Sequence, residues 1–116
     1  MLARTNPRPR HPSELRAARW YRLRFWRVLD ANVWHAGAEI DLIVRRGRVL
    51  AFCEVKSKAS DAFGDPLEMV DGVKAARVRR AALAWLGAHP ECGGLDVRFD
   101  VIAERAGRIE HVAGAF

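Results

Sequence analysis

The stretch Ala38–Lys58, AEIDLIVRRGRVLAFCEVKSK, predicts the centre of the fold. Two mostly apolar runs flank a glycine-containing turn, which is the pattern of an antiparallel hairpin. Acidic residues are depleted in strands because they pack poorly on a half-buried pleated surface. This hairpin nevertheless carries Glu39, Asp41 and Glu54, and Lys56 follows two residues after Glu54. The four charges therefore require an explanation beyond packing.

Strand side chains alternate between the two faces of a sheet, and this alternation groups the charges. On the first strand it assigns one face to Glu39, Asp41 and Ile43 and the other to Ile40, Leu42 and Val44. We place the turn centre at Arg46-Gly47, which pairs Asp41 with Phe52. Glu54 then falls opposite Glu39 and diagonal to Asp41, and diagonal neighbours on one face are about 7–8 Å apart. Lys56 shares the face of Glu54.

Carboxylates this close repel one another unless a positive charge lies between them. Mg²⁺ suits carboxylate oxygens and commonly binds one or two carboxylates together with waters and substrate phosphate. A lysine beside such a cation can orient an attacking water or help to deprotonate it. Asp41, Glu54 and Lys56 therefore predict a site that hydrolyses a phosphodiester; as the alternative, the acids are surface residues paired with basic side chains.

The composition indicates one small basic domain. The chain has 116 residues, a net charge of +6 and a pI of about 10.3, which favours nucleic acid as a partner. Two cysteines suggest no disulfide framework, and we expect a reduced, cytoplasmic protein. We find no membrane-spanning run and no signal-peptide core. We expect residues 1–12 to form a mobile basic arm and residues 13–116 to form a single domain.

The order of predicted elements indicates an α/β fold. Local patterns predict, in order, a helix from Glu14 to Arg24 capped by Ser13, a short strand from Trp26 to Leu29, a turn at DANVWHAG, the hairpin with its second strand from Val49 to Lys56, a helix from Leu67 to Leu86 with a capping box at residues 65–68 and a break near Asp71-Gly72, and strands near Leu95–Val101 and Arg108–Val112. The first three strands form an antiparallel meander, and the long helix allows the next strand to return parallel. The result is a mixed sheet with flanking helices.

The spacing D-x(12)-E-V-K, from Asp41 to Lys56, resembles the catalytic core of the PD-(D/E)XK, or restriction-endonuclease-like, nucleases. The blocks GAEIDLIVRRGRVLAFCEVKSK, AFGDPLEMVDGVKAARVRRAALAWL and VRFDVIA resemble the YraN-type bacterial family of predicted endonucleases, which is similar in fold to archaeal Holliday-junction resolvases. The resemblance implies a restriction-endonuclease-like core, αβββαβ plus a final strand. Ile40 replaces the superfamily's proline, and Phe25 stands where a glycine usually ends the first helix.

The resemblance also implies roles for individual residues. Asp41 and Glu54, with the carbonyl of Val55, would bind Mg²⁺ or Mn²⁺, and Lys56 would be the catalytic lysine. Glu14 stands where such folds often keep a helix acid that completes the site, although an acid in the first turn of a helix also suits the macrodipole. Lys74 matches the family's helix lysine. Separately, Glu39 is either a third ligand or a supporting acid.

Two functions remain open at this level. The first is a metal-dependent nuclease acting on DNA, with branched or single-stranded DNA among the candidate substrates; the second is a nucleic-acid-binding module that keeps the fold with weak or no catalysis. Lys74, Arg77 and Arg80 gather on one helix face, which either contacts phosphates or is ordinary solvated surface. Trp26 and Trp85 have the pattern of core residues, and Trp34 is undecided. A homodimer is also left open.

Overall fold

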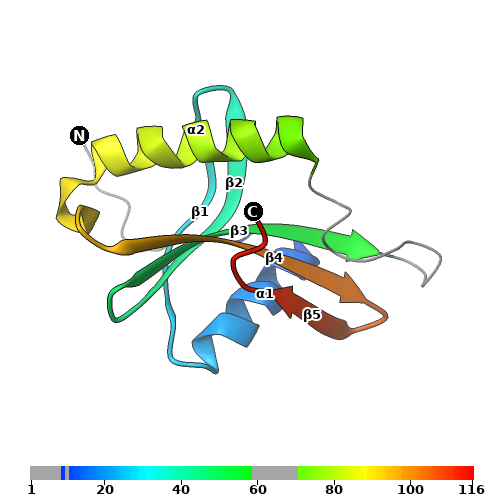
Figure 1. Ribbon diagram of the computed structural model, residues 1–116. Coiled ribbons are helices and arrows are strands. Elements are labelled where there is room, and N and C mark those ends of the chain that lie inside the picture. The colour runs from blue at the N-terminus through cyan, green and yellow to red at the C-terminus, as the bar shows by residue number, and fades with distance from the viewer. Residues whose placement is uncertain (1–8, 10, 59–70) are drawn as a thin grey trace.

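The structure is a computed structural model that describes residues 9, 11–58 and 71–116. Its elements, in order, are α1 (Pro12–Arg22), β1 (Arg27–His35), β2 (Ala38–Arg46), β3 (Val49–Lys58), α2 (Gly72–Ala88), the short 3-10 helix η2 (Pro90–Cys92), β4 (Asp96–Arg105) and β5 (Arg108–Val112) (Figure 1). The predicted capping box at 65–68 lies outside the described residues, as does most of the predicted arm.

One five-stranded sheet, in the order β1-β2-β3-β4-β5, organises the molecule. Neighbouring strands are antiparallel except β3 and β4, which pair in parallel and are connected through α2. Parallel neighbours require a crossover of this kind, because the chain must return to the end of the sheet at which the first strand began, and a tight turn is too short to do so. The predicted α/β fold, with its antiparallel meander and parallel return, is confirmed.

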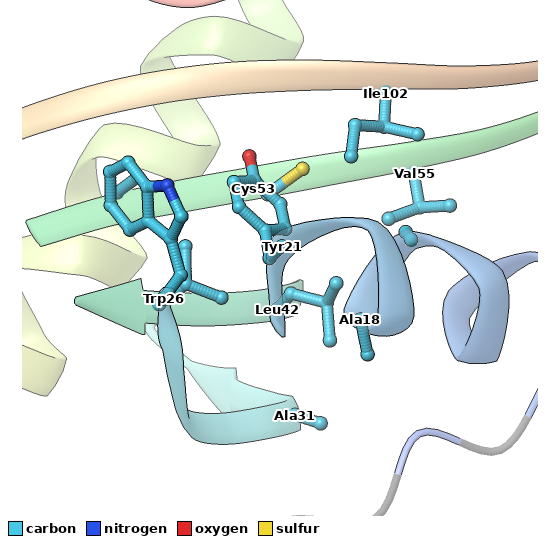
Figure 2. Close-up of a cluster of buried hydrophobic side chains, with 11 residues drawn as sticks. Ala18, Tyr21, Trp26, Ala31, Leu42, Cys53, Val55 and Ile102 are labelled. Carbon is cyan, nitrogen blue, oxygen red and sulfur yellow. The ribbon is translucent and has the colours of Figure 1, made fainter. Parts of the chain in front are cut away.

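The two helices cover opposite faces of the sheet (Figure 1). The face under α1 buries a cluster that includes Tyr21, Trp26, Leu42 and Cys53 (Figure 2). The other face buries Phe52 and its neighbours against α2. Burying both faces removes the central strands from water, which explains why β2 and β3 are rich in apolar residues on both sides. The core assignments of Trp26 and Trp85 are confirmed.

The first strand was predicted too short. β1 continues to His35, and the stretch predicted as a turn is strand up to a two-residue turn at Ala36-Gly37. Both turn residues have positive φ, 51° and 79°, as a type I′ hairpin turn requires. The alternation that would have identified β1 is interrupted, because its pairing register shifts between Val28 and Asp30 and because Asn32 is left-handed at φ 52°.

The predicted register of the second hairpin is wrong by two residues. Ile43, not Asp41, pairs with Phe52, and Arg46 pairs with Val49. The loop is therefore the two residues Gly47 and Arg48, with Gly47 at φ 59°, the arrangement of a type II′ turn. Because side chains repeat every two residues, a register shift of two does not by itself move a side chain to the other face.

The predicted face assignment fails toward the start of β2, where Ile40 lies. Ile40 and Ile43 belong to the same buried cluster under α2, whereas regular alternation places them on opposite faces. Leu42 packs in the cluster under α1, as expected. The alternation of β2 is therefore broken beside Asp41, opposite the left-handed Asn32 of the neighbouring strand.

The start of α1 differs from the prediction, and the predicted start of the second helix at Leu67 lies outside the described residues. His11, not Ser13, caps α1, and the helix ends at Arg22. Asp71 caps α2, with its Oδ1 accepting a hydrogen bond from the backbone N–H of Lys74 at 2.8 Å. The predicted break near Asp71-Gly72 thus marks the beginning of α2. Among the described residues, no helix is long and apolar enough to cross a membrane.

Candidate active site

The candidate site lies where β2 and β3 separate. The β2–β3 pairs run from Arg46–Val49 to Leu42–Cys53. Beyond them, the backbone N–H of Val55 donates to Oδ2 of Asp41 at 2.8 Å, so a side chain replaces a strand partner. A cleft of about 640 Å³ opens there, lined by the first turns of both helices, the β1–β2 turn and the ends of β2 and β3.

Three carboxylates meet on one side of this cleft. Glu14 comes from the first turn of α1, and Glu39 and Asp41 come from β2. Each offers one oxygen, and these three oxygens lie within 4.8 Å of one another. Glu14 and Asp41 are buried and Glu39 is half-buried. Glu14 lies on the buried face of its helix, with Ala17, Ala18 and Tyr21, and its carboxylate also accepts a hydrogen bond from the backbone N–H of His11 at 3.4 Å.

Asp41 is the most perturbed acid of the group. Burial raises the pKa of Asp41 to about 7, and the charges of Glu54, Glu14 and Glu39 add to that rise. The hydrogen bond from the N–H of Val55 acts in the opposite direction, because it favours the ionised carboxylate. The carboxyl group of Asp41 therefore retains its proton to a higher pH than an exposed aspartate does.

Glu54 lies beside this acid cluster and has two lysine partners. Its Oε1 is 3.2 Å from Nζ of Lys56 and 2.6 Å from Nζ of Lys74. The Glu54 carboxylate is buried, while both lysines remain partly exposed to the cleft. Burial alone would lower the pKa of Lys74, but the hydrogen bond to Glu54 leaves that pKa above its ordinary value. The cleft therefore has a carboxylate side and a lysine side.

The predicted basic helix face divides in two. Lys74 points into the cleft toward Glu54, whereas Arg77 and Arg80 are exposed. Arg77 lines the cleft, and together with Arg80 it also lines a shallow depression around the start of α2. Arg77 therefore connects the cleft to the outer basic surface of the helix.

Two further residues of the cleft were not predicted. Trp34 lines it and is 66 % exposed, and Asp71 lines it at the cap of α2. Trp34 pairs with Glu39 across the β1–β2 hairpin. That pairing would have revealed Trp34 as a site residue, had the full length of β1 been recognised. Asp71 has the pattern of a helix cap, and its place in the cleft follows from where α2 begins.

A second polar cluster lies away from the cleft, around Asp100. This fully buried carboxylate accepts hydrogen bonds from Oη of Tyr21 at 2.7 Å and from Arg98 at 2.7 and 2.9 Å, and it lies 2.8 Å from Nε2 of His111. Burial opposes its ionisation, but these partners hold the pKa of Asp100 below its usual range. The cluster ties α1 to β4 and β5, and it gives His111 a structural role that the sequence did not suggest.

The element order and the mixed sheet define an α/β protein with a restriction-endonuclease-like core, in which charged side chains gather where the two central strands part. The chain belongs to the family described as "Uncharacterised protein family UPF0102", whose model matches residues 13–103. The matched segment contains every acid and lysine of the cleft described above.

Relatives in several bacteria have the same family name. A UPF0102 protein of Frankia casuarinae is 44 % identical over 94 residues, which cover 77 % of this chain and 79 % of the relative. A UPF0102 protein of Anaeromyxobacter dehalogenans is 43 % identical over 109 residues, covering 89 % and 79 %. One from Geobacter sulfurreducens is 42 % identical over 110 residues, covering 89 % and 83 %. The similarity therefore extends over most of each chain.

Proposed function

We propose that this protein is a Mg²⁺- or Mn²⁺-dependent nuclease that hydrolyses DNA phosphodiester bonds. The observation that carries the proposal is the composition of the cleft, which brings three carboxylates, Asp41 among them, beside a fourth carboxylate that is paired with two lysines. The similarity of the Asp41-to-Lys56 segment to PD-(D/E)XK nucleases supports the same conclusion.

The acid cluster fits a hard divalent cation. Oxygens of Glu14, Glu39 and Asp41 lie within 4.8 Å of one another, and carboxylates are the protein ligands that Mg²⁺ and Mn²⁺ prefer. Glu54 and the carbonyl of Val55 are the further ligands that the nuclease resemblance implies. Both belong to β3, where the backbone N–H of Val55 donates to Asp41 of β2. When bound, the cation would activate water and offset charge developing on the scissile phosphate.

The protein's own groups would position the reactants. Lys56 follows Val55, whose backbone N–H donates to Asp41. The ammonium group of Lys56 pairs with Glu54 and therefore lies at the edge of the acid cluster. There Lys56 would orient the attacking water and stabilise its loss of a proton. Lys74 holds Glu54 at 2.6 Å and would be available to a phosphate oxygen at the same place. Arg77 and Arg80 would hold the adjoining DNA backbone.

A nicking assay tests the proposal. Single-stranded, duplex, flap and four-way DNA would be incubated with the protein in Mg²⁺, in Mn²⁺ and in EDTA. We expect cleavage that requires the metal and that is abolished in Asp41→Asn and in Glu54→Gln. Both exchanges are nearly isosteric and remove charge from a crowded site, so neither should unfold the protein.

The outcome also decides between the proposal and its alternative. Cleavage by Asp41→Asn at the parental rate would refute the assignment of the site. Metal-independent DNA binding without cleavage of any of the four substrates would instead identify a binding module that keeps the nuclease fold.

A further inference from the structure

We propose that Trp34 is a stacking platform for an unpaired base, so that the cleft selects DNA with a single-stranded nucleotide next to the bond that is cut. This inference rests on the proposed nuclease function and names its class of substrate. It concerns a residue to which the proposed metal binding and the proposed action of the lysines assign no role.

The position of Trp34 suits such a role. Trp34 is 66 % exposed, although it lines the same cleft as Asp41 and Lys56. Trp34 pairs with Glu39, and Asp41 follows Glu39 by two residues on β2, which corresponds to roughly 7 Å along the strand. A nucleotide whose phosphate lies at the acids and lysines therefore has its sugar and base within reach of the indole.

Trp34 is more exposed than the other three tryptophans. Trp26 and Trp85 are buried and pack edge-on against Tyr21 and Phe52, respectively. Trp20 is half-buried and packs against Tyr21 and His111. These three contribute to the core or its border, whereas Trp34 presents most of its surface at the mouth of a charged cleft. A large exposed aromatic ring beside phosphate-binding groups is the arrangement that single-strand-binding proteins use.

Stacking on Trp34 would discriminate between DNA structures. In an intact duplex each base is stacked on its neighbours, so its face is available only after unpairing or at an end. In a single strand, a flap or a junction, a base can turn toward an aromatic side chain without that cost. Lys56, Lys74 and Arg77 would contact phosphates in either form, so they would not supply this preference.

Binding measurements without metal test the inference independently of cleavage. The probes are a fluorescently labelled oligothymidylate and a hairpin duplex with the same number of phosphates, both in EDTA. We expect Trp34→Ala to weaken binding of the single strand by roughly 5- to 150-fold, the range that removal of one base–aromatic stack gives, and to leave duplex binding nearly unchanged. Trp34→Phe should recover most of the affinity. Tryptophan fluorescence should be quenched by the oligothymidylate in the parent and much less in Trp34→Phe.

The matched control is Phe25→Ala, which removes the aromatic ring of a residue that is 87 % exposed and does not line the cleft. It should bind both probes like the parent. Equal weakening of both probes by Trp34→Ala, or no weakening of either, would overturn the inference. Selective weakening of single-strand binding in a protein that cuts no DNA would support the stacking role while refuting the nuclease.

Discussion

Asp41 and Val55 are joined by a hydrogen bond in which the backbone N–H of Val55 donates to Oδ2 of Asp41. The bond continues the β2–β3 contact beyond the pair Leu42–Cys53, with a carboxylate in place of a strand carbonyl. It satisfies a buried donor and holds the acid against the segment that carries Glu54 and Lys56. Strand separation and carboxylate placement are therefore one feature of this sheet.

Stability without metal should fall as pH rises from about 4 to about 7 and should then level off. Because the pKa of Asp41 is raised to about 7 in the folded protein, the folded state retains a proton that the unfolded chain releases near its ordinary pKa of 3.8. Folding stability therefore falls progressively between about pH 4 and pH 7, by about 2–4 kcal/mol for this group. Urea unfolding in EDTA at pH 5 and pH 8.5 measures the change.

Asp41→Asn is the control for that measurement. The variant carries no proton to lose, so its stability should depend less on pH than that of the parent, and it should be the more stable of the two at pH 8.5. Added Mn²⁺ should stabilise the parent at that pH and the variant much less, since ligand binding to the folded state raises stability. A parent that is no less stable than Asp41→Asn at pH 8.5 in EDTA would contradict the crowding of these acids.

Lys56→Ala should separate chemistry from metal binding. Removal of a group that positions the attacking water typically lowers the rate by ~10²–10⁴-fold, while the carboxylates that we propose as cation ligands remain. Cleavage rates and calorimetric titration with Mn²⁺ would be compared with those of Arg108→Ala, which removes an exposed cation on β5. Full activity in Lys56→Ala would leave Lys56 as no more than a partner of Glu54.

The outer basic face of α2 should contribute to DNA affinity by neutralising phosphates. Neutralising one phosphate fewer lowers the slope of log affinity against log salt by about 0.9, so replacing both Arg77 and Arg80 by alanine should lower it by nearly 2. Fluorescence anisotropy with duplex DNA over a salt series measures the slope. The matched double variant replaces Arg19 and Arg22, which are exposed at the end of α1. If that variant alone lowers the slope, DNA binds across α1 instead.

Phe25→Gly should stabilise the protein. Phe25 follows α1 with φ 69°, a left-handed conformation that costs an L-residue roughly 1–2 kcal/mol and costs glycine little. Its ring is almost fully exposed, so the substitution removes little buried surface. We expect a gain of about 1 kcal/mol in the free energy of unfolding. Leu23→Gly, at a right-handed position with φ −65°, should be destabilising, and a less stable Phe25→Gly would contradict the strain.

Periodicity predicted much of this fold, and it failed where periodicity itself is broken. The hairpin and its parallel return followed from alternation and from the length of the crossover helix. β1 was truncated because its register shifts after Val28, and Ile40 was misplaced because β2 changes face beside Asp41. The turn was misjudged because a two-residue loop at Gly47 and a longer loop around the same glycine leave nearly the same sequence signal.

Within the site, spacing predicted neighbours on the hairpin but not partners from elsewhere in the chain. Asp41, Glu54 and Lys56 lie on adjoining strands, so their spacing along the hairpin predicts that they are near one another, although β2 changes face beside Asp41. The pairing of Lys74 with Glu54 depends on where α2 begins and how it crosses the sheet. The approach of Glu14 to Asp41 likewise depends on the packing of α1, which no local pattern encodes.

The Asp100 cluster bears on the order in which the parts of the cleft form during synthesis. A chain growing from the ribosome presents Glu14, Glu39 and Asp41 early, but α1 is anchored through Tyr21 to a carboxylate 79 residues further along. Because synthesis is vectorial, that anchor is made only after β4 has been synthesised. We therefore expect Glu14 to take its final place among the other acids only after β4 has been synthesised, so that the acid cluster forms well after the strand that carries Glu39 and Asp41.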